Sequence, residues 1–132
     1  AIGIVQLKRF SELALKRQKI AKTYDLLLSK SEYISPLLHN YNEVVPHIYV
    51  VRIKGLKNRR ELQKRFLIKN IQIGYHYKPN HWLSIYEDKS LSLHITESIF
   101  PELISLPLHP EISKDDVECV VENLTNTLSE FL

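Results

Sequence analysis

The sequence of 132 residues contains one cysteine, three glycines and no methionine. A single thiol excludes an internal disulfide framework and fits a reducing compartment, so we expect a cytoplasmic protein. We expect Cys119 to be a small buried side chain on a helix. The three glycines, Gly3, Gly55 and Gly74, cannot build a glycine-rich phosphate loop, and no Walker A, dinucleotide-binding or Ser-His-Asp pattern is present.

Long hydrophobic runs are also missing from the sequence. No apolar stretch approaches the roughly 18 residues that a membrane span needs, and the N-terminus lacks the order of basic, apolar and small residues that marks a signal peptide. Apolar residues make up 44% of the chain and charged residues 25%, which is typical of a globular domain. We therefore expect one domain with no membrane partner.

Charge is distributed unevenly along the chain. Residues 1–66 hold fourteen Lys and Arg against five Asp and Glu, whereas residues 67–132 hold four against ten. A basic half can bind nucleic acid or an anionic substrate, or it can consist of long helices with solvated faces. The basic run over 57–65 has no interleaved aromatic residues for base stacking, so we favour a solvated helix face and expect no nucleic-acid partner.

Hydrophobic periodicity predicts the order of secondary structure. The elements expected along the chain are a long helix over 2–31, a loop over 32–46, a strand over 47–54, a helix over 59–69, a strand over 71–77, a short helix over 81–86, a turn at 87–89, a short helix near 98, an extended segment over 103–108 and a final helix after 113. This order is typical of an α+β fold, with helices flanking a small antiparallel sheet.

Capping residues and apolar stripes refine the helices. Asn58 and Ser113 are expected N-caps. The short helix near 98 starts at Thr96 or Ser98, and Ser98 fits better as the cap because Pro101 then falls in the first turn. On the helix over 59–69, the residues expected in the core are Leu62, Phe66 and Leu67, and the basic residues expected in solvent are Arg59, Arg60, Lys64 and Arg65. The buried stripe expected on the final helix is Val117, Val120, Val121, Leu124, Leu128 and Phe131.

The segment from Gly74 to His81 is the best candidate for a functional site. It holds two histidines, two tyrosines and an asparagine, whose imidazoles, phenols and amide bind polar ligands through hydrogen bonds. Gly74 within an apolar strand indicates a bulge or a close approach. One alternative is a sheet-edge turn with hydrogen-bonded surface histidines. The other is a metal site joining His76, His81 and His109, which the absence of HExxH, CxxC and nearby carboxylates disfavours.

Four stretches in this order, residues 1–9, 16–24, 73–81 and 106–110, carry a family resemblance that covers essentially the whole chain. They resemble parts of the DegT/DnrJ/StrS sugar-nucleotide aminotransferases, which use pyridoxal phosphate. The first two resemble the helix that links the family's large and small domains. The third, Ile-Gly-Tyr-His-Tyr-Lys-Pro-Asn-His, resembles its G-x-H-Y-x-P-x-H loop, and the fourth, Leu-Pro-Leu-His-Pro, resembles the lead-in to its last helix.

This resemblance implies the C-terminal small domain of an aspartate-aminotransferase-like enzyme, with residues 1–31 as a linking helix and residues 32–132 as an α/β body. The implied reaction transfers an amino group from an amino-acid donor, typically glutamate, to a nucleotide-linked keto sugar, for amino-sugar or surface-polysaccharide biosynthesis. The implied cofactor, pyridoxal phosphate, is bound mainly by a large domain that this chain lacks. The family's Schiff-base lysine has no counterpart in the sequence, so we expect the chain alone to be inactive.

For this chain, the resemblance implies that His76 and Tyr77 face the cleft and bind substrate, with His81 behind them. It implies no catalytic or cofactor-binding residue here, and it implies a homodimer for the whole enzyme. No N-cap residue precedes Ile2, so we expect the chain to begin inside a helix whose first turns, up to Leu7, are frayed or packed against another chain. The alternative function is a non-catalytic binding or scaffolding remnant of such an enzyme.

Overall fold

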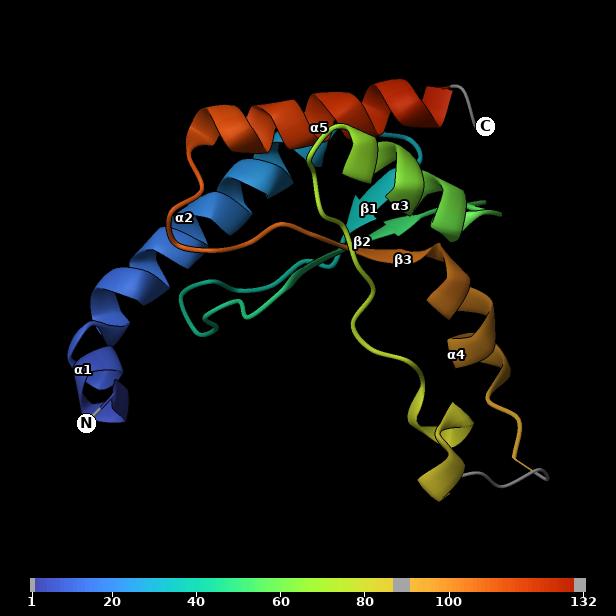
Figure 1. Ribbon diagram of the computed structural model, residues 1–132, viewed down its shortest axis with the longest axis horizontal. Helices are drawn as coiled ribbons and strands as arrows, with labels where there is room; N and C mark the ends of the chain where they lie inside the picture. Colours follow the sequence, from blue (N-terminus) through green and yellow to red (C-terminus); the bar gives the residue numbers. More distant parts are fainter. Residues whose placement is uncertain (1, 87–90, 130–132) are drawn as a thin grey trace.

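A three-stranded antiparallel sheet lies at the centre of the computed structural model, which describes residues 2–86 and 91–129 (Figure 1). Helices α2, α3 and α5 pack against the sheet around one shared core. The expected α+β fold with a small antiparallel sheet flanked by helices is therefore confirmed. The turn expected at 87–89 and the buried side chain expected at Phe131 lie outside the described residues.

In order along the chain, the elements are α1 (Ile2–Lys8), α2 (Phe10–Leu28), β1 (Ile34–Pro36), β2 (Tyr49–Ile53), α3 (Arg59–Ile68), the 3₁₀ turns η1 (Asn80–Trp82) and η2 (Ser84–Tyr86), α4 (His94–Ile99), the 3₁₀ turn η3 (Phe100–Glu102), β3 (Leu103–Leu106) and α5 (Lys114–Ser129). Long connections join β1 to β2, over 37–48, and α3 to η1, over 69–79. In Figure 1, η1, η2 and α4 form an arm that extends away from the sheet.

The sheet has the order β1-β2-β3, and both pairs of strands are antiparallel. Val51 lies in register with Pro36 on one side and Ile104 on the other. Along β2, Tyr49, Val51 and Ile53 are buried, and the residues between them are partly exposed. This alternation is the period of two expected for a strand whose one face covers a core.

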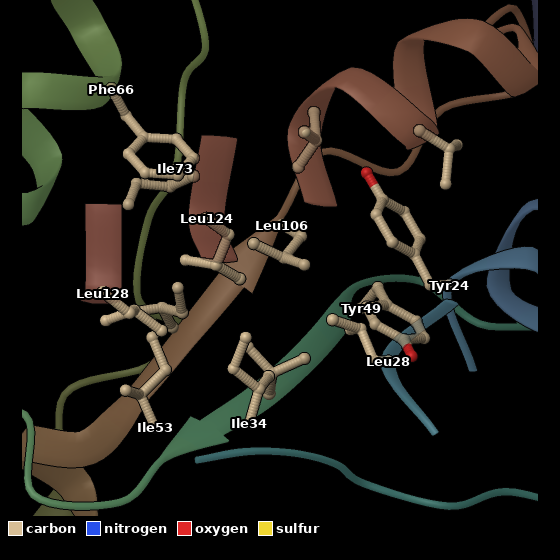
Figure 2. Packing of buried hydrophobic residues seen from close by; sticks show 14 of the residues in the cluster. Tyr24, Leu28, Ile34, Tyr49, Ile53, Phe66, Ile73, Leu106, Leu124 and Leu128 are labelled. Carbon is tan, nitrogen blue, oxygen red and sulfur yellow. The ribbon is translucent and has the colours of Figure 1, made fainter. Parts of the chain in front are cut away.

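The core combines aliphatic side chains with a stacked pair of tyrosines (Figure 2). The rings of Tyr24 from α2 and Tyr49 from β2 have centroids 4.7 Å apart and planes inclined by 23°. The Tyr24 hydroxyl donates to the Pro107 carbonyl at 3.0 Å, and the Tyr49 hydroxyl donates to Asp25 at 2.6 Å. Burial raises the pKa of both phenols. Both rings therefore bury their carbon surface without leaving a hydroxyl unpaired.

The N-terminal helical segment is divided rather than continuous. Arg9 forms a turn between α1 and α2, and α2 ends at Leu28, so the prediction of one helix over 2–31 is corrected at both places. No residue of α1 is buried: Ile2 is 81% exposed and Leu7 74% exposed. None of the helices in the described ranges combines the length and apolarity that crossing a bilayer requires.

Two of the three predicted helix caps are confirmed. Asn58 Oδ1 accepts the Glu61 N–H at 3.1 Å at the start of α3. The hydroxyl of Ser113 accepts the Asp116 N–H at 3.1 Å, and the Ser113 N–H donates to the Asp116 carboxylate at 2.9 Å, which together form a capping box. The prediction for Ser98 is wrong, because α4 begins earlier, at His94, and the Ser98 hydroxyl donates to a carbonyl within that helix.

Several other expectations are corrected by tertiary contacts. Leu67 is 66% exposed because it lies off the α3 face that buries Leu62 and Phe66. Arg59 is partly buried rather than solvated, and Cys119 is exposed rather than buried. The segment expected as a loop over 32–46 contains β1, and the strand expected over 71–77 is reduced to one bridge at Gly74. The short helix expected over 81–86 is replaced by the two 3₁₀ turns η1 and η2.

Candidate functional site

The candidate loop, residues 74–82, starts at the edge of the sheet. Gly74 pairs with Ser105 of β3: the Gly74 N–H donates to the Ser105 carbonyl at 3.0 Å, and the Ser105 N–H donates back at 2.7 Å. Figure 1 shows the segment after α3 running past the end of β3 at this point. The backbone of the loop is therefore fixed to the sheet immediately before His76.

His76 packs back onto this anchor. Its Nδ1 lies 2.9 Å from the hydroxyl of Ser105, a residue only 5% exposed. A Cβ atom added at Gly74 would lie 3.1 Å from Cε1 of the His76 ring, which is tighter than ordinary packing. Gly74 was expected to mark a bulge or a close backbone approach, whereas the atoms that approach it belong to the side chain of His76.

The hydrogen bond to Ser105 leaves one nitrogen of His76 for a ligand. Among residues 2–86 and 91–129, Nε2 has no hydrogen-bond partner. When the Ser105 hydroxyl donates to Nδ1, Nε2 carries the proton and is a donor; when Nδ1 donates, Nε2 is an acceptor. Either tautomer presents a single oriented group to a polar ligand.

Tyr77 lies beside His76 at the exposed side of the loop. The two rings meet edge to face with centroids 4.9 Å apart, and the peptide bond between them is cis. Tyr77 is 67% exposed. An imidazole and a phenol thus lie side by side on one short stretch, and of the two only His76 lines the groove described below.

His81 has a different environment from the other two predicted site residues. Its side chain is only 7% exposed, and its Nε2 lies 3.0 Å from Glu97 Oε1 on α4. Glu97 also accepts the Leu93 N–H at 3.0 Å. That backbone bond is the main reason why the pKa of Glu97 is below its usual value, and His81 adds to the shift. His81 therefore ties the loop to α4 and lies apart from His76.

His76 borders a groove of about 780 Å³. Its walls come from residues 47–48, residues 69–74 with His76, residues 105–109 with Ile112, and the first turns of α5. Two further histidines, His47 and His109, also line it. Hydrogen bonds from Ser113 lower the pKa of Asp116, another lining residue, and the nearby His109 lowers it further. The groove thus offers imidazoles and a carboxylate that is ionised at neutral pH.

Sequence reasoning missed several residues of this groove. Ser105 is the polar position within the apolar run 103–108, and that signal marks it as a buried hydroxyl in need of a partner. His47 and Cys119 line the groove only because the fold brings them there, since they lie 29 residues before and 43 residues after His76 in the sequence. No local pattern joins them.

Comparison with known proteins identifies the family. Residues 1–125 match the model of the DegT/DnrJ/EryC1/StrS aminotransferase family. The chain belongs to this family. The recognition suggested by the loop and the C-terminal stretch is thereby confirmed.

Curated family relatives match nearly all of this chain. A UDP-4-amino-4,6-dideoxy-N-acetyl-beta-L-altrosamine transaminase from Campylobacter jejuni is 27% identical, with 98% of this chain and 36% of the relative covered. A UDP-4-amino-4-deoxy-L-arabinose--oxoglutarate aminotransferase from Shewanella sediminis is 32% identical, with 91% and 34% covered. The chain therefore spans about a third of the length of these relatives.

Solved structures agree with the fold. The aminotransferase TlmJ from Streptoalloteichus hindustanus superposes with a TM-score of 0.82 at 28% identity, covering 99% of this chain and 36% of that one. Spr1654 from Streptococcus pneumoniae, a candidate sugar aminotransferase solved in its PLP-form, gives a TM-score of 0.83 at 30% identity, covering 98% and 35%. The fold in Figure 1 thus recurs within longer aminotransferase chains.

Lysines in residues 2–86 and 91–129 are mostly exposed. Schiff-base formation needs a lysine amine held in a site where the cofactor can reach it. Among the lysines that the structure describes, only Lys16 is partly buried, and its amine is paired with Glu12 at 3.0 Å and Glu111 at 3.3 Å. Lys69 borders the groove but is exposed. No lysine in the described ranges therefore offers a buried, unpaired amine.

A metal site has no better support. Within the described ranges, no three His, Cys, Asp or Glu side chains gather closely enough to hold a metal ion. His81, one of the three histidines considered for such a site, is bound to Glu97. Among the described residues, the loop presents the Nε2 of His76 and the exposed phenol of Tyr77.

Proposed function

We propose that this chain is the C-terminal portion of a pyridoxal-phosphate-dependent aminotransferase that acts on a nucleotide-linked keto sugar. The observation that carries the proposal is the family match over residues 1–125. The names of relatives such as the UDP-sugar transaminases of Campylobacter jejuni and Shewanella sediminis support the substrate class. The amino donor is an amino acid, typically glutamate, and the product serves amino-sugar or surface-polysaccharide biosynthesis.

In this proposal the chain contributes one wall of the active-site cleft. His76 and Tyr77 bind and orient the sugar or the amino donor, because both present polar groups beside a groove or at an exposed edge. His81 supports them by holding the loop against Glu97. The cofactor, its lysine and most of its phosphate contacts belong to a large domain outside residues 1–132, so residues 1–31 link the two domains and residues 32–132 form the small one.

The proposal extends to assembly and location. The whole enzyme is a homodimer with its active sites near the subunit interface, and it works in the cytoplasm without a nucleic-acid or membrane partner. Two basic residues of α3 already have partners within the protein or are withdrawn from solvent: Arg65 lies 3.4 Å from Glu61, and Arg59 is partly buried. This supports the absence of a nucleic-acid role.

The test uses the full-length protein with glutamate and a UDP-linked 4-keto sugar. We expect transfer of the amino group, and we expect His76→Ala to raise KM about tenfold, which corresponds to the loss of one hydrogen bond to a ligand. His39→Ala is the matched control, because His39 is an exposed histidine away from the groove. Amino transfer that never occurs with any nucleotide-linked keto sugar would favour the non-catalytic remnant instead.

A further inference from the structure

The candidate loop is held to the body by an aromatic residue at each end. Tyr75, directly before His76, meets the ring of Phe100 edge to face with centroids 5.8 Å apart. Trp82, at the end of the loop, meets the same Phe100 ring edge to face at 5.4 Å. One residue of η3 therefore contacts both ends of the segment that carries His76 and Tyr77.

The guanidinium of Arg59 also contacts two of these aromatic rings. The guanidinium carbon of Arg59, the first residue of α3, lies 4.1 Å from the centroid of the Tyr75 ring and 4.5 Å from that of Phe100. Its Nη1 donates to the carbonyl of Phe100 at 2.8 Å and to that of Leu103 at 3.2 Å. Arg59 thus joins three elements: the start of α3, the turn η3 with the start of β3, and the candidate loop.

These contacts require the shape of arginine. A planar guanidinium stacks on aromatic faces and donates in its own plane at the same time, whereas a lysine ammonium is a point donor on a flexible stem. Burial lowers the pKa of Arg59 from its ordinary value, in keeping with a guanidinium that is partly removed from water. Its neighbour Arg60 is exposed and has none of these contacts.

We propose that Arg59 is a positioning residue, which fixes the loop over 74–82 in the orientation that presents His76 and Tyr77. It acts through Tyr75 and Phe100 and does not touch the ligand. The functional half of this inference rests on the proposed aminotransferase function, whereas the positioning itself does not. The two are therefore measured separately.

Hydrogen–deuterium exchange of the full-length protein tests the positioning. In Arg59→Met, which keeps an unbranched apolar stem, we expect amides of residues 75–82 to exchange about tenfold faster, while amides of α5 keep their rates. Arg59→Lys should give an intermediate rate, because it keeps the charge but loses the planar stack. Arg60→Met, the matched control, should leave the loop unchanged.

Unchanged exchange over 75–82 in a folded Arg59→Met protein would overturn the inference. Faster exchange throughout α5 would show that Arg59→Met does not fold. In that case the same comparison is made with Arg59→Lys and Phe100→Leu, and unchanged loop exchange in both variants would overturn the inference.

Steady-state kinetics then test the function: we expect Arg59→Met to raise KM more than it lowers kcat, and Arg59→Lys to restore KM in part. Faster loop exchange with an unchanged KM would reject the ligand role of His76 and leave the positioning role intact.

Discussion

At the scale of single residues, Glu102 joins parts of the chain that lie far apart in sequence. Its Oε2 accepts from Arg52 Nε at 2.6 Å, and its Oε1 accepts the Gly55 N–H at 2.8 Å. Gly55 has a positive φ of 80°, a conformation that glycine adopts without strain. The bond from Gly55 is the largest reason why the pKa of Glu102 is lowered, and the bond from Arg52 is the next.

These bonds predict a pH dependence of stability. A carboxyl whose pKa is lower in the folded state stabilises the protein above its unfolded pKa, near 4.5, and this contribution is lost as pH falls through the lower folded value. We expect Glu102→Gln to lower Tm by roughly 2–4 °C at pH 7 and by less at pH 3. Thermal unfolding followed by circular dichroism between pH 3 and 7 measures this difference.

The exposed Glu122 of α5 provides the control for that measurement. Glu122→Gln should give a curve of Tm against pH parallel to that of the unchanged protein. A Glu102→Gln curve that is also parallel, with the same offset at pH 3 and pH 7, would show that ionisation of Glu102 does not stabilise the fold.

Residue types alone indicated part of the candidate site. The density of polar aromatic residues marked His76 and Tyr77, and a glycine inside an apolar stretch marked the close approach at Gly74. The partners were not predictable, because Ser105 is 29 residues beyond His76 and Glu97 is 16 beyond His81. Arg59 was interpreted as solvated for the same reason: its aromatic contacts come from other elements.

At the scale of elements, local signals placed two of the three expected helix caps, whereas pairing between distant segments was not predicted. Asn58 and Ser113 were predictable as caps, because each bonds to an N–H three residues ahead. β1 was missed because it has only three residues, one of them Pro36, and exists by pairing with β2. The strand expected after α3 makes a single bridge, since only Gly74 there pairs with β3.

The contrast between two serines gives a prediction about helix ends. Ser113→Ala removes the hydroxyl that accepts the Asp116 N–H and should lower the free energy of unfolding by about 1 kcal/mol. Ser98→Ala is the matched control, and it should change stability by less than about 0.5 kcal/mol because its hydroxyl bonds only within α4. Urea unfolding measures both values. Equal losses in the two variants would contradict the assignment of Ser113 as the cap.

At the scale of the whole molecule, one core joins the sheet to the helices that cover it. Nineteen buried residues form one cluster that joins the sheet to α2, α3 and α5, whereas α1 buries none of its residues. The fold class could be predicted, because periodicity and composition are properties of each segment. The separation of His81 from His76 could not, since it depends on where the arm of η1, η2 and α4 lies.

The exposure of the described lysines predicts how the isolated chain behaves with pyridoxal phosphate. Residues 1–132 incubated with pyridoxal phosphate should develop no stable band near about 420 nm that borohydride abolishes, because no described lysine is held in a cofactor site. The full-length protein should develop it. Absorbance spectra recorded before and after borohydride treatment measure this, and free lysine is the control for non-specific reaction with the cofactor. A stable band in the isolated chain would contradict the proposed division between domains.

The exposed thiol of Cys119 allows a chemical label to be attached at the groove. It is the sequence's sole thiol, it lies on the outer side of the first turns of α5, and it lines the same groove as His76. A trifluoromethyl reagent attached there would place a fluorine label at the groove without altering the loop. Its resonance would then report on occupancy of the groove in solution, independently of any turnover.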